Sequence, residues 1–224
     1  LPQESYLDIV KIIDAAKKLD CDSIHPGYGF LSENQNFAKI CKREGIIFIG
    51  PSIEAMGLTG DKVKAKKIAS TVAPVIEGRE VSNERDALSL STNIGFPVIL
   101  KAVEGGGGRG LRVVKTIDEL KQAFVSAKKE SLLGFGSDRI YIEKYIENPR
   151  HIEVQILSDK STILHLGERE CSIQRRHQKL IEETPSPALS DDKRNQITEI
   201  AKNIIKELEY DNAGTVEFLF KNGE

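Results

Sequence analysis

The feature that most constrains this fold is a glycine-rich segment between two short apolar runs. Residues 98–100 are apolar, residues 111–114 are apolar except for Arg112, and five glycines and Arg109 stand between the two runs. Short β-branched runs separated by glycine predict two strands joined by a loop with few side chains. Because glycine has no Cβ, backbone N–H groups of such a loop can approach an anion closely, and Lys101 and Arg109 add positive charge. The segment therefore predicts a hairpin that covers a phosphate chain.

Other glycine-rich signatures explain this segment less well. Gly105, Gly107 and Gly110 have the spacing of the dinucleotide fingerprint, but that motif opens a helix and strand-forming residues follow here. No lysine followed by serine or threonine closes the run as in a P-loop, and a kinase would need its lysine after the loop. A flexible hairpin without a ligand is the remaining alternative, and four successive glycines are hard to explain by packing alone.

Composition restricts the class of protein. The 224 residues are 39% hydrophobic and 29% charged with a net charge of −2, as is typical of globular proteins in water. This balance gives no electrostatic reason to expect nucleic acid or membrane partners. No apolar run reaches the about 18 residues of a membrane span. Three cysteines without C-x-x-C spacing argue against a disulfide framework or a zinc site. They predict a reducing compartment, the cytoplasm or, in a eukaryote, the mitochondrial matrix.

The first 58 residues alternate between helical and strand patterns. A capping box at Ser5 starts an amphipathic helix over residues 5–20, and a second helical pattern over residues 32–44 has its cap at Ser32. The continuous apolar run at residues 46–49 predicts a parallel strand buried on both faces. This order predicts part of a doubly wound, Rossmann-like α/β half-domain. The apolar face of the first helix is expected to consist of Leu7, Val10, Ile13, Ala16 and Leu19.

The remaining chain has mixed α+β patterns. Residues 51–60 are expected to be a linker that leads into a short basic helix over residues 61–70. Beyond it, helices are predicted over residues 83–93, 116–131 and after Ser190, and strands over residues 140–143, 151–157, 163–167 and 214–220. The part around the glycine hairpin is a candidate lid domain that closes over a nucleotide. The chain opens on leucine and ends in a turn, so we expect it to be part of a longer polypeptide, truncated at both ends.

Several side chains could bind a nucleotide. A nucleoside triphosphate needs cations, carboxylates for Mg²⁺ and an apolar slot for the base, which residues 143–146 could edge. Lys62 and Lys101 supply charge, although a solvated lysine in a basic helix is the stronger explanation of Lys62 from spacing alone. Glu217 shares a strand face with Leu219 at an expected sheet centre. A carboxylate there is costly unless it binds a metal or a partner.

A dense cluster of charge covers residues 167–179. Its cations are Arg175, Arg176, His177 and Lys179. They could position small anions, but a solvated loop balanced by nearby glutamates explains the spacing equally well. Cys171 as a nucleophile would need a base, and nothing in the sequence brings His177 to it, so a structural thiol is the better explanation. His25 and His151 are by default hydrogen-bonded structural histidines.

Six stretches together resemble the biotin carboxylase family, the ATP-grasp component of biotin-dependent carboxylases. In chain order they are residues 24–34, residues 60–62, the glycine hairpin, residues 143–155, residues 168–179 and residues 214–220. The likeness spans essentially the whole chain and implies an ATP-grasp fold preceded by part of a Rossmann-like domain. It implies part of an N-terminal domain at 1–58, a helical linker at 59–74, the lid domain at 75–146 and the first part of the C-terminal domain at 147–224.

The resemblance also implies an activity, an ATP-dependent carbon–nitrogen ligation. Bicarbonate would attack the γ-phosphate of ATP to give carboxyphosphate, and biotin on a biotin carboxyl carrier protein would be carboxylated at its ureido nitrogen. The chain would be the biotin carboxylase component of an acyl-CoA carboxylase, acting on acetyl-CoA or propionyl-CoA, or of a pyruvate carboxylase. Mg²⁺, or Mn²⁺ in its place, would accompany ATP, and biotin would be a carrier-bound substrate. A carboxyltransferase component and a second copy of the full-length protein are the further implied partners.

The resemblance assigns roles residue by residue. It implies that Lys62, Lys101 and His177 contact phosphates. It also implies that the loop with Gly105, Gly106, Gly107, Gly108 and Gly110 closes over them. Glu143, Lys144 and the backbone of Ile146 would contact adenine. His151 and Gln174 would contact the ribose, and Leu219 would make a further contact to the nucleotide. Glu217 would bind Mg²⁺ and Lys179 bicarbonate, and the catalytic candidates are Arg176, His177 and Lys179.

Alternatives remain open at this point. The family's second magnesium glutamate, its bicarbonate arginine and its general base would follow Glu224, so we expect this stretch alone to be inactive. Another ATP-grasp ligase, of the carbamoyl-phosphate synthase or purine-pathway type, is the second enzyme hypothesis. A non-catalytic nucleotide-binding or assembly module is the third hypothesis. The run at 174–179 and the His25-Pro-Gly motif favour biotin carboxylase.

Overall fold

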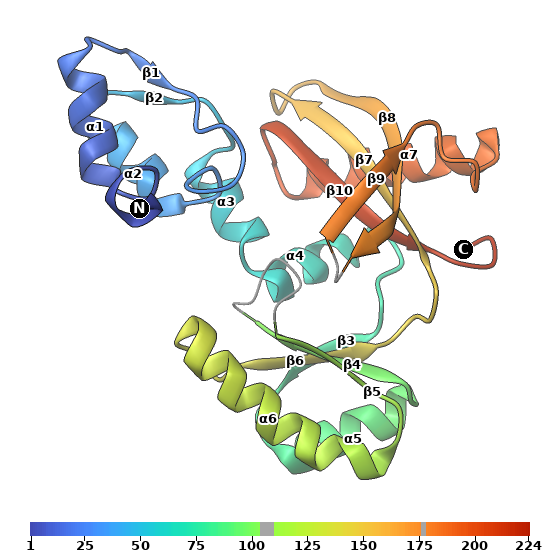
Figure 1. The fold of residues 1–224 in the computed structure, drawn as a ribbon. Helices are drawn as coiled ribbons and strands as arrows, with labels where there is room; N and C mark the ends of the chain where they lie inside the picture. The colour runs from blue at the N-terminus through green and yellow to red at the C-terminus, as the bar shows by residue number, and fades with distance from the viewer. Residues whose placement is uncertain (104–109, 176–177) are drawn as a thin grey trace.

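The computed structural model describes residues 1–103, 110–175 and 178–224, and for Lys62 and Phe135 it describes the backbone only (Figure 1). Three sheets follow one another along the chain. The first is a parallel pair, and the other two are four-stranded antiparallel sheets with the orders β3-β6-β4-β5 and β10-β7-β8-β9. The mixture of parallel α/β and antiparallel α+β parts confirms the expected fold class. Within the described residues, no helix has the length and apolar character needed to cross a membrane.

The N-terminal part packs two helices on a short parallel ribbon. Its elements are the 3-10 turn Pro2–Glu4, α1 Ile9–Lys18, β1 Ser23–Ile24, α2 Gln35–Arg43 and β2 Ile47–Phe48. β1 and β2 pair in parallel, as a doubly wound half-domain requires. The buried core consists of Ile13, Ala16, Leu31, Phe37, Cys41 and Ile46.

Four expectations for this part are wrong. α1 begins after Asp8, whose carboxylate accepts a hydrogen bond from Lys11 N, so the chain uses this later cap and Ser5 does not start the helix. α2 is likewise capped by Asn34 and not by Ser32. The buried face of α1 consists of Ile13 and Ala16 with Ile9 and Ile12 packed beside them, whereas Leu7, Val10 and Leu19 are exposed, because a strict spacing of three residues drifts around a helix of 3.6 residues per turn. β2 is not buried on both faces, because Ile47 is 64% exposed.

Two short helices connect this part to the antiparallel sheets. They are α3 Ile53–Thr59 and α4 Lys62–Ala69. α3 lies within the segment expected to be a linker, and it is capped by Ser52, whose hydroxyl accepts from Ala55 N. Asp61 caps α4 by accepting from Val63 N and Lys64 N. These caps begin each helix at a defined residue and thereby place α4 over the lid sheet (Figure 1).

The lid domain is a sheet with helices on one face. Its elements are β3 Gly78–Val81, α5 Glu84–Ile94, β4 Val98–Ala102, β5 Leu111–Val114, α6 Ile117–Phe135 and β6 Ile140–Lys144. The two strands predicted on either side of the glycine segment are confirmed, since β4 and β5 pair antiparallel from Val98–Val114 to Lys101–Leu111, while residues 104–109 lie outside the described residues. Alternate residues of these strands point toward α5 and α6 and form the lid core with them. The core residues from the strands are Val81, Val98, Leu100, Val114, Ile140 and Ile142.

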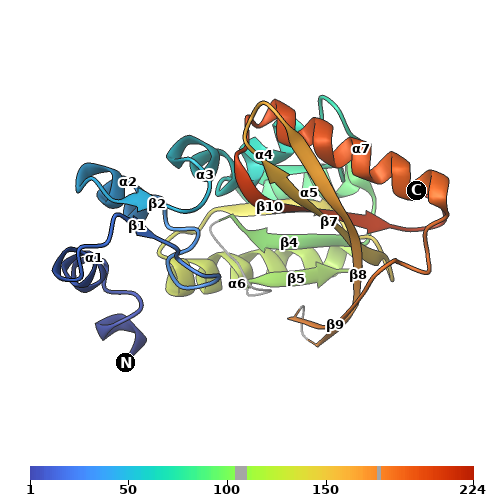
Figure 2. The ribbon, with the colours of Figure 1, turned by 90° about the horizontal axis from the view of Figure 1, so that it is seen from above.

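The second antiparallel sheet packs one face on a long helix. Its elements are β7 Arg150–Ser158, β8 Ile163–Arg175, β9 Gln178–Glu183, α7 Asp191–Glu207 and β10 Asn212–Phe220. Ile152, Val154 and Ile156 of β7 face α7. Residues 167–175, expected to be a charged loop, lie within the long strand β8. β10 pairs with β7 at the edge of the described sheet, so the expectation that Glu217 lies at a sheet centre is wrong. The two antiparallel sheets are stacked in Figure 1 and overlap in the view from above (Figure 2).

Candidate functional site

Each antiparallel sheet has a second face that its own helices do not cover. In the lid, Lys101, Tyr141 and Glu143 lie on this face, because they alternate with the residues that form the lid core. It is turned toward α4 and the second sheet (Figure 1). In the second sheet, the corresponding face carries His151 and Glu153 of β7 and their β10 neighbours Leu219 and Glu217. Polar and charged side chains from separate motifs therefore gather on two sheet faces.

The lid face carries a buried carboxylate shared by two lysines. Glu143 is 4% exposed, and its Oε2 accepts a hydrogen bond from Lys66 Nζ of α4 at 2.5 Å. Its Oε1 pairs with Lys101 Nζ of β4. Burial acts to raise the pKa of Glu143, but the charges of Lys101 and Lys66 outweigh it and hold that pKa below its usual value. Glu143 is therefore an anion, and together with Lys66 and Lys101 it forms a cluster with a net positive charge.

A small cavity adjoins these three charges. Its volume is about 230 Å³, and its lining combines α4 with the open face of the lid sheet. The lining residues are Thr59, Val63, Ala65, Lys66, Lys101, Ala102, Val103, Tyr141 and Glu143. Burial, together with the charge of Glu143, raises the pKa of Tyr141 to about 12, so its hydroxyl stays neutral. An apolar slot next to cations suits part of a nucleotide, because whole-ligand sites usually exceed about 300 Å³.

The second sheet carries a charge network of four residues, one on each of its four strands. Glu153, 4% exposed, accepts a hydrogen bond from Arg169 Nε at 2.6 Å and also pairs with Lys179 Nζ. Lys179 Nζ lies 2.5 Å from Glu217 Oε1 as well. Burial acts to lower the pKa of Lys179, but Glu153 and Glu217 outweigh it and raise that pKa above its usual value. Lys179 is therefore a cation at neutral pH, suited to bind a small anion.

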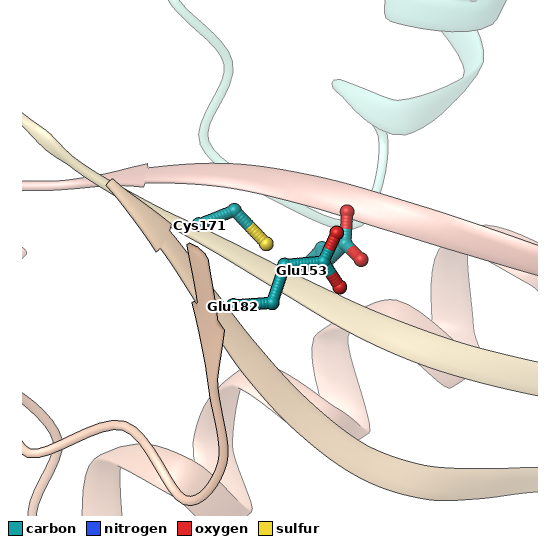
Figure 3. Close-up of side chains that lie close together, drawn as sticks. All are labelled: Glu153, Cys171 and Glu182. Atoms are coloured by element: carbon teal, nitrogen blue, oxygen red, sulfur yellow. The ribbon is translucent and has the colours of Figure 1, made fainter. Parts of the chain in front are cut away.

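Glu153, Cys171 and Glu182 lie side by side on the same sheet (Figure 3). Their potential ligand atoms lie within 4.8 Å of one another. The Glu153 carboxylate already pairs with Arg169 and Lys179, and burial, with the charge of Glu153, raises the pKa of Cys171 to about 11. A protonated thiol is a poor metal ligand and a poor nucleophile. The geometry thus agrees with a structural role for Cys171.

Other predicted site residues have varied surroundings. Lys144 Nζ donates to the carbonyls of Gly95 and Phe96 at 3.0 and 3.1 Å, so the structure does not bring it to the Glu143 carboxylate. Ile146 is half-buried just after β6. The backbone N–H of His151 donates to Ser172 Oγ, and His151 and Leu219 are partners in the β7–β10 pair. Gln174 Nε2 donates to the carbonyl of Cys171 at 2.8 Å.

Some predicted residues lie outside what the structure describes. They are Gly105, Gly106, Gly107, Gly108, Arg109, Arg176 and His177, together with the side chain of Lys62. Gly110 is described, and its φ of +72° is a conformation that favours glycine. It stands directly before β5, where the hairpin returns to the sheet.

The structure adds four residues that the sequence reasoning did not select. They are Lys66, Tyr141, Glu153 and Arg169. Two of them had a signal in the sequence. Glu153 is two residues after His151, so the two side chains share one face of the strand. Lys66 stands four residues after Lys62, one helical turn along α4. Tyr141 and Arg169 had no signal in the sequence, because the residues that they contact are determined by how the sheets pack.

The loop at residues 25–34 lines a second, larger cavity between the N-terminal part and the second sheet. Its volume is about 530 Å³. Its walls include His25, Tyr28 and Glu33 from the loop and Gln155 from β7. His25 Nδ1 accepts a hydrogen bond from Gly27 N at 3.0 Å, as expected for a hydrogen-bonded histidine. The His25-Pro-Gly motif thus lies at a concave site.

The charges of the described residues match those of a magnesium nucleotide, which needs cations for its phosphates and a carboxylate for its metal ion. Lys101 offers a cation beside an apolar slot, and Glu217, whose side chain is 63% exposed, can offer a carboxylate oxygen to a cation. Glu153 is less suitable as a metal ligand, because two cations already bind it.

Two family models match the chain. The model described as the biotin carboxylase N-terminal domain matches residues 1–56, and the model described as the carbamoyl-phosphate synthase L chain ATP-binding domain matches residues 61–224. The pyruvate carboxylase of Bacillus subtilis is 52% identical over 100% of this chain and 20% of its own length.

Solved structures agree with these matches. A biotin carboxylase complex with β,γ-ATP from Campylobacter jejuni superposes with a TM-score of 0.95 and is 51% identical, over 99% of this chain and 51% of that one. The biotin carboxylase domain of a Hydrogenobacter thermophilus 2-oxoglutarate carboxylase, a dimer in complex with MgADP, ADP and bicarbonate, gives 0.93 at 42% identity, over 98% and 49%. The chain thus spans about half of these solved chains.

Proposed function

Because the chain belongs to the biotin carboxylase family and carries the ATP-binding domain that this family shares with the carbamoyl-phosphate synthase L chain, we propose that it supplies the nucleotide site of a biotin carboxylase. The reaction we propose for the whole protein is the ATP- and bicarbonate-dependent carboxylation of carrier-bound biotin by way of carboxyphosphate. The relatives named for biotin carboxylase and pyruvate carboxylase support this reaction.

The observation that carries the proposal is the pairing of Lys101 with Glu143 beside the small cavity. Lys101 is the penultimate residue of β4, the strand that leads into the glycine segment, so a cation stands at the base of the predicted phosphate-covering loop. Phosphoryl transfer relies on positioning and charge stabilisation more than on covalent chemistry of the protein. A lysine on a sheet, backed by a buried carboxylate, is a preorganised phosphate ligand.

We assign the remaining roles as part of the same proposal. Lys179, held as a cation by Glu153 and Glu217, binds bicarbonate next to the nucleotide. Glu217 offers a carboxylate to Mg²⁺ or Mn²⁺, which would supply charge neutralisation at the phosphate oxygens when bound. The further nucleotide contacts that we propose are Lys62, the loop glycines, Glu143, Lys144, Ile146, His151, Gln174, His177 and Leu219. The further catalytic residues that we propose are Arg176 and His177.

The proposal extends to domains and partners. We propose the division 1–58, 59–74, 75–146 and 147–224 as the domain plan, since each antiparallel sheet falls within one of the last two ranges. The partners proposed are a biotin carboxyl carrier protein, a carboxyltransferase component and a second copy of the full-length protein, in the cytoplasm or the mitochondrial matrix. The dimeric Hydrogenobacter domain supports the second copy.

The first test measures ATP turnover by the full-length protein that contains this chain. With MgATP and bicarbonate present, free biotin is expected to stimulate ADP release. Lys101→Met is expected to reduce this turnover at least roughly 100-fold, because it removes a charge contact made to the transferring phosphoryl group. Lys129→Met, which removes an exposed lysine on α6 of the same lid, is the matched control and should leave turnover unchanged.

The outcomes distinguish the hypotheses. Turnover that is insensitive to biotin would favour another ATP-grasp ligase, for which the carbamoyl-phosphate synthase family match is the supporting observation. MgATP binding without any turnover would favour a binding or assembly module. Wild-type turnover in Lys101→Met would reject the phosphate role of Lys101.

A further inference from the structure

Lys66 and Lys101 share one carboxylate but differ in their other contacts. Lys66 Nζ donates to Glu143 Oε2 at 2.5 Å and to the carbonyl of Ile76 at 3.1 Å, and it lies 5.1 Å from the centroid of the Tyr141 ring. The ion-pair partner of Lys101 among the described residues is Glu143. Lys66 is thus fixed by a carboxylate, a backbone carbonyl and an aromatic face, whereas Lys101 is fixed by the carboxylate alone within the described contacts.

Glu143 cannot lose both cations without a large cost. Its side chain is 5% exposed, and a buried carboxylate without a counterion is strongly unfavourable. The backbone of Gly78 packs so closely on it that a Cβ at Gly78 would come within 2.5 Å of Glu143 Cβ, which leaves no room on that side for a further side chain. If Lys101 turns from Glu143 to a phosphate, the carboxylate depends on the cation that remains.

We propose that Lys66 is a positioning residue for nucleotide binding, which keeps Glu143 neutralised when Lys101 exchanges that carboxylate for the phosphates of the nucleotide. The inference rests on the proposed function, because it assumes that Lys101 binds phosphate. Lys66 acts through Glu143 and does not itself bind the nucleotide. Its anchors at Ile76 and Tyr141 keep it on the carboxylate while Lys101 moves.

Proton uptake on nucleotide binding gives a readout of the charge around Glu143 that a merely structural lysine would not affect. Within the part of the chain that the structure describes, the charged and titratable groups that face Glu143 are Lys66 from α4, Lys101 from β4 and the neutral Tyr141 from β6, while Gly78 of β3 contributes no side chain. With Lys66 present, nucleotide binding leaves Glu143 an anion and takes up no proton at this site. Without Lys66, Glu143 must take up about one proton when Lys101 leaves it, because a buried lone carboxylate has a raised pKa.

The test uses the full-length protein and MgADP, titrated by calorimetry in two buffers of different ionisation enthalpy. Lys66→Met is expected to weaken MgADP binding roughly tenfold or more and to couple it to proton uptake, because one partner of a buried pair is missing. Lys66→Arg, which keeps the charge, should restore most of the affinity. Lys67→Met, an exposed lysine on the same helix, is the matched control and should bind as wild type.

A double-variant cycle separates positioning from direct contact. In a Glu143→Gln background the carboxylate no longer needs a counterion, so Lys66→Met should then change the MgADP dissociation constant by less than about threefold. This pair also guards against misfolding, since it leaves no buried anion unpaired.

Three results would overturn the inference. They are wild-type affinity and no proton uptake in Lys66→Met, an equally large loss of affinity in the Glu143→Gln background, and no rescue by Lys66→Arg. A wild-type protein that binds no MgADP would instead overturn the proposed function, and with it the premise of the inference.

Discussion

At the scale of single residues, four buried glutamates are anions in a sheet protein of ordinary composition. They are Glu143, Glu153, Glu168 and Glu170. Each is at most 6% exposed, and each has its pKa below the usual value of 4.5, since paired cations and hydrogen-bond donors outweigh the effect of burial. Glu168 is typical, because it accepts from Arg194 Nε at 2.8 Å and from Ser186 N at 3.0 Å. A depressed pKa stabilises the folded state above the unfolded pKa, and this stability is lost as pH falls through the folded pKa. We therefore expect the free energy of unfolding to decline as pH falls below about 4.5. Urea denaturation at several pH values should show a shallower acid decline for Glu168→Gln and no change in slope for Glu207→Gln, which replaces an exposed glutamate near the end of α7. Equal slopes in Glu168→Gln and wild type would contradict this account.

At the scale of elements, the two lid helices pack with a defect that a substitution can remove. Ser91 of α5 and Ser131 of α6 are fully buried, and their hydroxyls are the buried side-chain atoms without a hydrogen-bond partner among the described residues. A desolvated hydroxyl without a partner is destabilising, and alanine also has the higher helix propensity. Ser91→Ala is therefore expected to stabilise the protein by roughly 1 kcal/mol, measured as a rise in thermal midpoint. Ser89→Ala, at an exposed position of the same helix, gives the propensity gain alone, so the difference between the two variants isolates the buried hydroxyl. An equal gain in both variants would mean that the Ser91 hydroxyl has a partner in solution.

At the scale of the whole molecule, a hydrogen bond connects the start of α3 to the turn before β10. Asp211, in the turn between α7 and β10, accepts from the backbone N–H of Ser52, the cap of α3, at 2.7 Å and across 159 positions of sequence. Replacing Asp211 by alanine leaves that N–H without its acceptor and loosens the start of α3. We expect hydrogen exchange to accelerate in residues 50–59 and to stay unchanged in the lid strands. Asp211→Asn keeps an acceptor oxygen and is the matched control. Faster exchange throughout the chain would instead indicate global destabilisation.

Much of this protein could be predicted from the sequence alone. The glycine hairpin, the helices capped at Asp61, Asn83 and Ser190, and the alternating strand β7 depend on signals within a few residues of one another. The motifs also led to the biotin carboxylase family, which the family models and relatives confirm. Local hydrogen bonding and side-chain periodicity act over short stretches of chain, and the sequence therefore determines them.

The tertiary structure alone decided which charges meet. Glu143 pairs with Lys66 across 77 positions, and Lys179 with Glu217 across 38, so neither pair leaves a periodic signal in the sequence. The tertiary structure also decided which side of α1 is buried, because Ile13 and Ala16 pack against Phe37 and Ile46 from other elements. Partners of a buried charge are set by how sheets and helices stack, and that stacking minimises exposed apolar area over the whole chain, not within any one segment.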